Sequence, residues 1–166
     1  MPILDKLSVL FNLKDSPTEK REKFFKAVEN ERLAEIDAFI ARDKDAVEWK
    51  DGEGVNALMI ACKYGHREVI EKLLEAGADI DARDKISTSA MGHAALMGQQ
   101  NIVKMLIGLG ADTRGTYEIA RRERKTGIME MLDNATAVKM EAKREQLGGR
   151  IEVMKPLSLR AFKPAA

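Results

Sequence analysis

The sequence predicts an all-α fold: a solenoid of stacked helix-turn-helix units joined by short loops. The first observation behind this prediction is a pair of amphipathic segments between Asn56 and Asp81. Apolar residues recur at helical spacing in both segments, and Gly65 and Gly77 stand where the two helices would end. Neither helix can bury its apolar stripe alone, so the pair needs neighbours. The apolar residues are Leu58, Ala61, Cys62, Val69, Ile70, Leu73 and Leu74.

The second observation is that this pattern returns 33 residues later, between Ser89 and Asp112. Gly65 maps onto Gly98, and the Gly-Ala-Asp triplet at 77–79 maps onto 110–112. Self-similarity at this period, with two helices in each period, is typical of arrays in which one repeat stacks on the next. The sequence therefore predicts a stacked helical array.

At these residues the chain resembles the ankyrin repeat family. The family begins its first helix with Thr-Pro-Leu-His, whereas this chain has Asn-Ala-Leu-Met at 56–59 and Ser-Ala-Met-Gly at 89–92. Because that Thr and His usually form hydrogen bonds that tie repeats together, we expect a looser array. The resemblance also implies short β-hairpin fingers at the repeat junctions, one beside Trp49 and one at 83–86. The matching motifs are Gly65-His66, Val69-Ile70, Leu73-Leu74 and Gly77-Ala78-Asp79, with their counterparts one period later.

Four ankyrin-like units are predicted between residues 16 and 133. The first is degenerate and begins at Ser16-Pro17-Thr18-Glu19, which combines a capping box with a proline at the first helical position. After Asp112 seven residues are missing from the period, so 113–115 is predicted to be a short link in place of a third finger. The predicted units are 17–50, 51–83, 84–114 and 115–133.

The segments on either side of these units do not match the repeat pattern. Residues 1–15 are predicted to form an amphipathic cap helix, with its apolar residues within 3–13. The alternative is a helix that docks on a partner or anchors the chain to a membrane. Its polar face offers only two basic residues, so membrane binding is the weaker interpretation. Residues 134–149 are predicted to form a C-terminal helix.

Residues 150–166 are predicted to be an extended or disordered tail. Prolines at 156 and 164 rule out a continuous helix, and four basic residues against one acidic residue give the tail a net charge of +3. The tail is richer in large apolar residues than a purely disordered segment usually is. We therefore favour a linear docking segment whose target is a partner or another copy of the chain. Its candidate contact residues are Leu157, Leu159, Arg160 and Phe162.

The composition narrows the class of protein. The chain has 166 residues, of which 45% are hydrophobic and 33% charged, values that favour a globular protein. A net charge of +1 argues against a general nucleic-acid binder. The single cysteine, Cys62, excludes an internal disulfide and is typical of a reducing compartment. No apolar run is long enough to span a membrane. We therefore expect a cytoplasmic protein.

No catalytic constellation stands out, and the sequence predicts no enzyme, no cofactor and no metal site. Cys62 and His66 have i, i+4 spacing, but no further ligand stands nearby and zinc prefers four. The carboxylates within 79–84 lack the glycine and the distal glutamate of a calcium loop. The resemblance gives His66 a structural role. The basic run at 121–125 has two interpretations, a contact for an acidic partner or a solvated cap face.

The first helices of such a stack line a concave groove that the fingers extend. The middle of this groove is predicted to be apolar with charged flanks, a pattern typical of interaction sites. Two alternatives remain: these side chains pack between adjacent first helices, or the tail covers them. The predicted partner-binding residues are Ile60, Lys63, Tyr64, His93, Leu96, Met97 and Arg122 in the groove, and Trp49 and Lys85 near the fingers.

These observations together predict a protein-protein interaction module that acts as an adaptor or as a scaffold subunit of a larger assembly. Binding would use the groove and the fingers, with the tail as a second contact. The resemblance does not name the partner, since its members bind unrelated proteins. The alternatives are a membrane-associated regulator anchored through residues 3–13, and a self-assembling structural protein whose tail fills the groove of the next copy.

Overall fold

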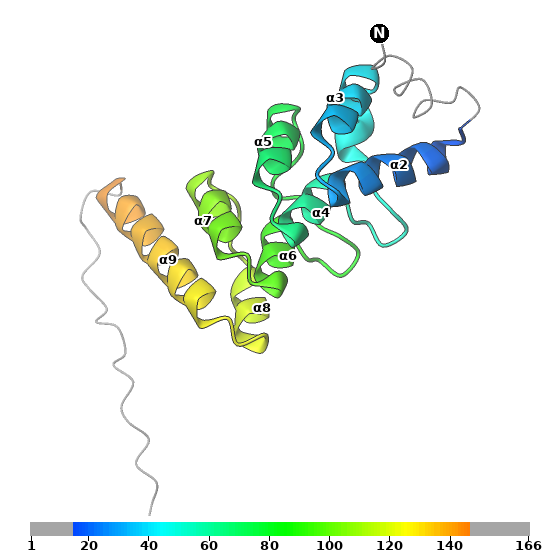
Figure 1. Ribbon diagram of the computed structural model, residues 1–166. Helices are drawn as coiled ribbons and strands as arrows, with labels where there is room; N and C mark the ends of the chain where they lie inside the picture. Colours follow the sequence, from blue (N-terminus) through cyan, green and yellow to red (C-terminus); the bar gives the residue numbers. More distant parts are fainter. Residues whose placement is uncertain (1–14, 147–166) are drawn as a thin grey trace, which may run out of the picture. The chain divides into compact units, whose positions relative to one another are not determined.

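The computed structural model describes residues 15–146, and within that range the chain is helical with no sheet (Figure 1). The predicted cap helix at 3–13 and the predicted tail at 150–166 lie outside the described residues. The helices are α2 (Pro17–Glu29), α3 (Leu33–Arg42), the 3-10 helix η1 (Lys44–Glu48), α4 (Ala57–Tyr64), α5 (Arg67–Glu75), α6 (Ala90–Met97), α7 (Gln100–Gly108), α8 (Thr116–Arg122) and α9 (Thr126–Gln146).

The helices form successive antiparallel pairs. Within the pairs, α2 packs on α3, α4 on α5, and α6 on α7. The first helices also pack on one another, α2 on α4, α4 on α6, and α6 on α8, so that they make one row through the array (Figure 1). This arrangement confirms the predicted all-α solenoid of helix-turn-helix units.

The chain divides after Asp133 into two compact units. The first unit contains α2 to α8 and the start of α9. The described part of the second unit, residues 134–146, is the remainder of α9, where Val138 and Met140 are exposed. The predicted second helix of the fourth unit and the predicted C-terminal helix are therefore parts of one continuous helix.

Local signals in the sequence set the ends of the helices. At the start of α2, the Ser16 hydroxyl accepts from the Glu19 amide and the Glu19 carboxylate accepts from the Ser16 amide, which is the predicted capping box. Asn56 and Ser89 cap α4 and α6 in the same way, each accepting from the amide three residues on. The two residues that differ from the family pattern therefore still cap their helices. Gly65 ends α4 with φ +81°, as predicted.

The core runs along the row of first helices and into the second ones. Its largest fully buried side chains include Phe24, Ile36, Met59 and Leu106. Each first helix also has a fully buried alanine in the same region of the helix, and a methyl side chain lets neighbouring helices approach closely. These alanines are Ala27, Ala61, Ala94 and Ala120.

The fingers between repeats are loops closed by a single bridge rather than by a ladder of strand pairs. Lys50 bridges to Asn56 in the first finger, and Arg83 bridges to Ser89 in the second. The Lys85 amide donates to the Glu53 carbonyl at 3.0 Å, which joins the two fingers directly. A Cβ at Gly54 would lie 3.1 Å from the Lys85 nitrogen, and the φ of Gly54 is +82°, so this junction requires glycine.

No third finger follows α7. Residues 113–115 connect directly to Thr116, the first residue of α8, as the missing seven residues predict. The space beside the second finger that a third finger would occupy is therefore open to the surface.

Candidate protein-binding surface

The clearest exposed apolar contacts on the first helices are Tyr64 and Met97, which occupy the same position in successive repeats. Their side chains are 46% and 52% exposed, at the ends of α4 and α6. Lys63 is exposed beside Tyr64, and its Nζ lies 5.4 Å from the centre of the tyrosine ring. Leu96 is half-buried beside Met97. These four residues form what we call the groove patch.

Ile60 does not belong to this surface. Its side chain is only 8% exposed, because α4 packs against both α2 and α6 and Ile60 lies within the core. For this residue the alternative interpretation holds, in which the side chain packs between neighbouring helices. Ile60 was therefore a wrong choice as an exposed contact.

Trp49, predicted as a partner contact, packs on the first repeat. Its ring meets the ring of Phe24 edge-on, with centroids 5.9 Å apart and an angle of 87°. Because the indole is half-buried against α2, it anchors the first finger to the first repeat.

The two histidines hold neighbouring parts of the fold together. His66 Nε2 lies 2.9 Å from the Glu29 carbonyl of the preceding repeat, and Tyr64 stacks on the imidazole with centroids 5.8 Å apart. This is the structural role expected for His66. His93 Nε2 lies 3.0 Å from the Asp84 carboxylate, so His93 positions the second finger from inside the array.

The second finger carries an exposed apolar residue that the sequence analysis missed. Ile86 follows the predicted contact residue Lys85, which is exposed, and Ile86 is itself 78% exposed. A lone large aliphatic residue within a polar loop was the available signal. Asp84 shapes this loop by accepting from the amides of Ile86 and Thr88.

A hollow of about 360 Å³ lies between the second finger, α6 and the start of α8. We call it the basic hollow, since three arginines line it and no carboxylate does among the described residues. Two predicted residues, Leu96 and Arg122, meet there. The other lining residues that matter below are Arg83, Arg114, Thr116 and Ile119.

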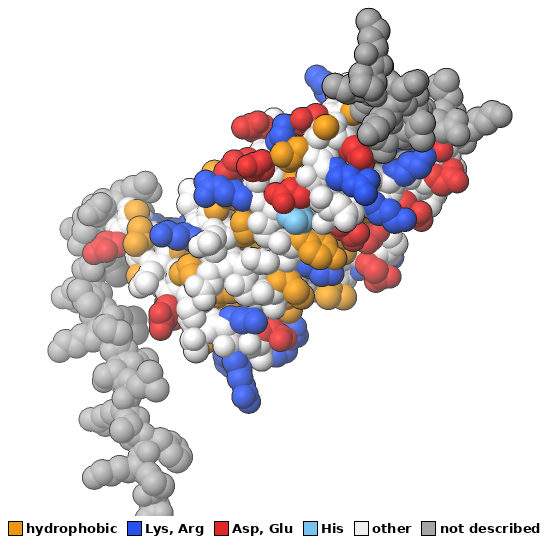
Figure 2. All heavy atoms as spheres, viewed as in Figure 1, with side chains coloured by type: hydrophobic (Ala, Val, Ile, Leu, Met, Phe, Trp, Pro, Cys, Tyr) orange, Lys and Arg blue, Asp and Glu red, His pale blue; other side chains and the backbone are white. Residues whose placement is uncertain are grey.

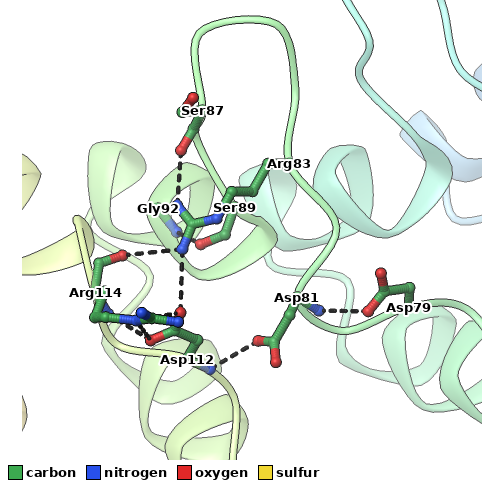
Figure 3. A network of polar contacts seen from close by, with 8 residues as sticks. All are labelled: Asp79, Asp81, Arg83, Ser87, Ser89, Gly92, Asp112 and Arg114. Atoms are coloured by element: carbon green, nitrogen blue, oxygen red, sulfur yellow. Dashed lines mark hydrogen bonds and ion pairs between the residues drawn. The ribbon is translucent and has the colours of Figure 1, made fainter.

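Figure 3 shows how two of these arginines are held at the repeat junction. Arg83 Nη2 and Arg114 Nε both donate to the Asp112 carboxylate, at 3.2 Å and 2.9 Å. The Asp112 amide in turn donates to Asp81 at 2.7 Å. Donation from the Arg114 side chain and amide, together with the nearby charge of Arg83, holds the pKa of Asp112 below its ordinary value.

Residues 24–116, more than half of the chain, match the family model described as ankyrin repeats in three copies. The chain belongs to the ankyrin repeat family. Ankyrin repeats are protein-protein interaction modules, and the match confirms the resemblance found at Gly65-His66 and the motifs around it.

Several curated proteins are similar over the repeats. The chain is 29% identical over 100 residues to mouse ankyrin repeat and SAM domain-containing protein 6, covering 60% of this chain and 11% of the relative. It is 32% identical over 90 residues to Arabidopsis thaliana putative E3 ubiquitin-protein ligase XBAT35, covering 48% and 20%. It is 27% identical over 124 residues to mouse neurogenic locus notch homolog protein 1, covering 75% and 4%. The chain thus spans a fifth or less of the length of these relatives.

The ankyrin array offers little for catalysis or metal binding where it is described. No group of three or more His, Cys, Asp or Glu side chains lies close enough to hold a metal ion within residues 15–143. Cys62 is fully buried, and burial raises the pKa of its thiol far above the ordinary value, so it is an unreactive core residue. None of the described helices has the length and apolar character to cross a membrane.

Proposed function

We propose that this ankyrin array is a protein-binding adaptor or scaffold subunit of a larger assembly, and that it is not an enzyme. The observation that carries the proposal is the groove patch, in which Tyr64 and Met97 expose apolar surface at equivalent positions of adjacent repeats. Tyr64 and Met97 each leave about half of a large side chain exposed to solvent, and a contact outside the fold accounts for this exposure.

The chemistry of the groove patch suits protein recognition. Tyrosine is among the residue types that contribute most to binding at interfaces, and methionine adapts its shape to a partner at low cost. Lys63 beside them supplies a charged rim. The second finger, with Lys85 and Ile86, extends the same row of repeats with a rigid loop.

We further propose that the tail acts as a second contact through Leu157, Leu159, Arg160 and Phe162. Its support is the sequence pattern alone, in which apolar and basic residues alternate around two prolines. Two contacts on one chain raise the overall affinity because the second binds at the effective concentration that the first creates. We also propose a cytoplasmic location, supported by the single, buried cysteine and testable by cell fractionation.

The experiment that tests these proposals is capture of partners from source-cell lysate with four proteins. These are the full chain, a chain ending at Gly149, a Tyr64→Ala/Met97→Ala variant and a Leu109→Ala control. Leu109 is as exposed as Met97 but lies at the end of a second helix, α7, outside the groove patch. The double variant should lose the captured protein and the control should retain it, with circular dichroism verifying that both are folded.

The outcomes separate the two contacts. Loss with the shortened chain alone would make the tail the functional element and the repeats its carrier. Equal retention by the full chain, the double variant and the shortened chain would overturn the proposal for both surfaces.

A further inference from the structure

The basic hollow has the character of a recognition site that the groove patch does not explain. Its floor and rim combine guanidinium groups with the aliphatic side chains of Leu96 and Ile119. It exists because residues 113–115 replace a third finger, which leaves the side of the second finger uncovered. The chain therefore presents charge and apolar surface together at one concave place.

The arginines of the hollow differ in which of their side-chain N–H donors already have a hydrogen-bond partner. Arg83 is held by Asp112, by the Ser87 carbonyl and by the Arg114 carbonyl. Arg114 and Arg122 each bond only through Nε, to Asp112 and Glu123. Within the described residues, both terminal nitrogens of these two arginines have no hydrogen-bond partner, and the side chains are 88% and 70% exposed.

One neutral group in the lining is also unsatisfied. The Thr116 side chain is buried, and its hydroxyl has no hydrogen-bond partner among the described residues. A buried polar group without a partner is uncommon in folded proteins and calls for an explanation. It lies in the wall of the same hollow as the arginines.

The charge of the chain changes sign at the second finger. Residues 15–82 carry 11 basic and 17 acidic side chains, a net charge of −6, whereas residues 83–125 carry 8 basic and 4 acidic, a net charge of +4. Figure 2 shows acidic and basic side chains interspersed over α2 to α5, and basic side chains near the end of α8. The local field around the hollow thus favours an anion although the whole chain is nearly neutral.

We propose that the basic hollow binds an acidic peptide segment of a partner protein. One carboxylate of the peptide accepts from the two terminal nitrogens of Arg122, and a second carboxylate accepts from those of Arg114. Two parallel hydrogen bonds from one guanidinium are the geometry in which it binds carboxylate best. A neighbouring apolar side chain of the peptide packs on Leu96 and Ile119. This inference rests on the proposed function, since it names the chemistry of the partner at one end of the groove.

Two other occupants fit the hollow less well. The chain's own tail has a net charge of +3, which the arginines repel. A nucleic-acid strand needs a basic surface that follows its phosphates over several nucleotides, and the acidic residues 15–82 adjoin the hollow on the other side. An acidic peptide can pair its carboxylates with the arginines and pack an apolar side chain against Leu96 and Ile119.

The probe is a synthetic peptide, Gly-Ser-Glu-Leu-Glu-Glu-Ser-Gly, with a matched peptide in which glutamine replaces each glutamate. Binding to the full chain is measured by two-dimensional amide NMR and by anisotropy of a labelled peptide. The glutamate peptide should shift the amides of Ser87, Thr88 and Thr116, and the glutamine peptide should not. Raising the salt from 0.05 to 0.5 M should weaken the binding.

The chain offers a closely matched pair of variants. Arg122→Glu should weaken binding of the glutamate peptide about tenfold or more, since it replaces a charge-assisted pair with a repulsion. Arg121→Glu changes the net charge equally at an equally exposed neighbour, 68% against 70%, that does not line the hollow. It should weaken binding less than about twofold. Equal effects of the two variants would mean that only general charge matters and would overturn the proposal.

Two further results would also overturn it. One is an absence of shifts at the three amides, and the other is a twelve-nucleotide DNA strand that shifts them more strongly than the peptide does. The Tyr64→Ala/Met97→Ala variant separates this inference from the proposed function. It should lose partner capture and still bind the peptide. Retained capture would overturn the proposed function alone, and loss of peptide binding by the folded variant would overturn this inference alone.

Discussion

The carboxylate of Asp81 accepts a hydrogen bond of 2.7 Å from the backbone amide of Asp112. Asp112 occupies the position in its repeat that Asp79 occupies in the preceding one. One period earlier Glu48 accepts from the amide of Asp79 at 3.2 Å. An acidic side chain at the base of each finger therefore ties one repeat to the end of the following one. This bond supplies a connection between repeats although the usual Thr and His of the family are replaced.

Removal of this connection should destabilise the array. We expect Asp81→Ala to lower the free energy of unfolding by about 1 kcal/mol, since it deletes a charged acceptor at an exposed site. Urea denaturation followed by circular dichroism measures the change. Glu130→Ala, at an exposed glutamate of α9 with no hydrogen bond among the described residues, serves as the control and should change stability by less than about 0.5 kcal/mol. Equal stability of the two variants would contradict the role given to Asp81.

Gly92, the glycine within α6, should not tolerate replacement by alanine, although this substitution usually stabilises helices. A Cβ at Gly92 would lie 2.8 Å from Thr88 Cγ2 and 3.0 Å from Ile119 Cδ1. Overpacking of about 1–3 kcal/mol should therefore exceed the gain of about 1 kcal/mol in helix propensity, and Gly92→Ala should lower the melting temperature.

Gly108 provides the matched comparison. It ends α7, and nothing lies within 4 Å of the position that its Cβ would take. Gly108→Ala should leave the melting temperature unchanged or raise it slightly. Opposite signs for the two glycines are expected in thermal unfolding, and a stabilised Gly92→Ala would show that α8 adjusts to the added methyl group.

The Cys62 thiol should react only when the array opens. Its side chain is fully buried and burial raises its pKa, so the folded state presents neither access nor thiolate. At pH 8, labelling by a thiol reagent should be slow for the native chain and fast in denaturing urea. Asp81→Ala should accelerate labelling in proportion to its loss of stability. Rapid labelling of the native chain would contradict the buried position.

Stability should fall in acid partly through Asp112. Its pKa is lowered in the folded state, so its contribution is complete above the ordinary value near 3.8 and is lost as the pH falls through the lowered value. Asp112→Asn should therefore be less stable than the unmodified chain at pH 7, and the difference should shrink below about pH 4. Urea denaturation at several pH values checks this. A difference that stays constant with pH would assign the effect to packing.

The sequence predicted those parts of the fold that depend on period and on local chemistry. The 33-residue repeat located the helix pairs, Gly65 located the end of α4, and Ser16 located the start of α2. Each of these signals acts within a few residues or recurs at fixed spacing. The predicted exposure of Tyr64 follows from the same periodicity.

Contacts between repeats could not be predicted from the repeat period or from local sequence signals. Ile60 and Tyr64 both lie on α4, and only the packing of α2 and α6 on either side decides that Ile60 is buried. The ring that packs on Trp49 belongs to Phe24, on an earlier helix. The basic hollow depends on where a loop is missing. The repeat period predicts the length of the gap but not which side chains surround it.

The short link at 113–115 makes the length of one loop the determinant of whether the side of the second finger is covered or open. Seven inserted residues would restore the period, and a finger built from them would cover Ile119 and Arg122 as the earlier fingers cover their neighbours. A deletion of this size therefore leaves open a surface that a finger would otherwise cover. Insertions and deletions at this junction are a route by which related arrays could gain or lose a binding site while every helix stays the same.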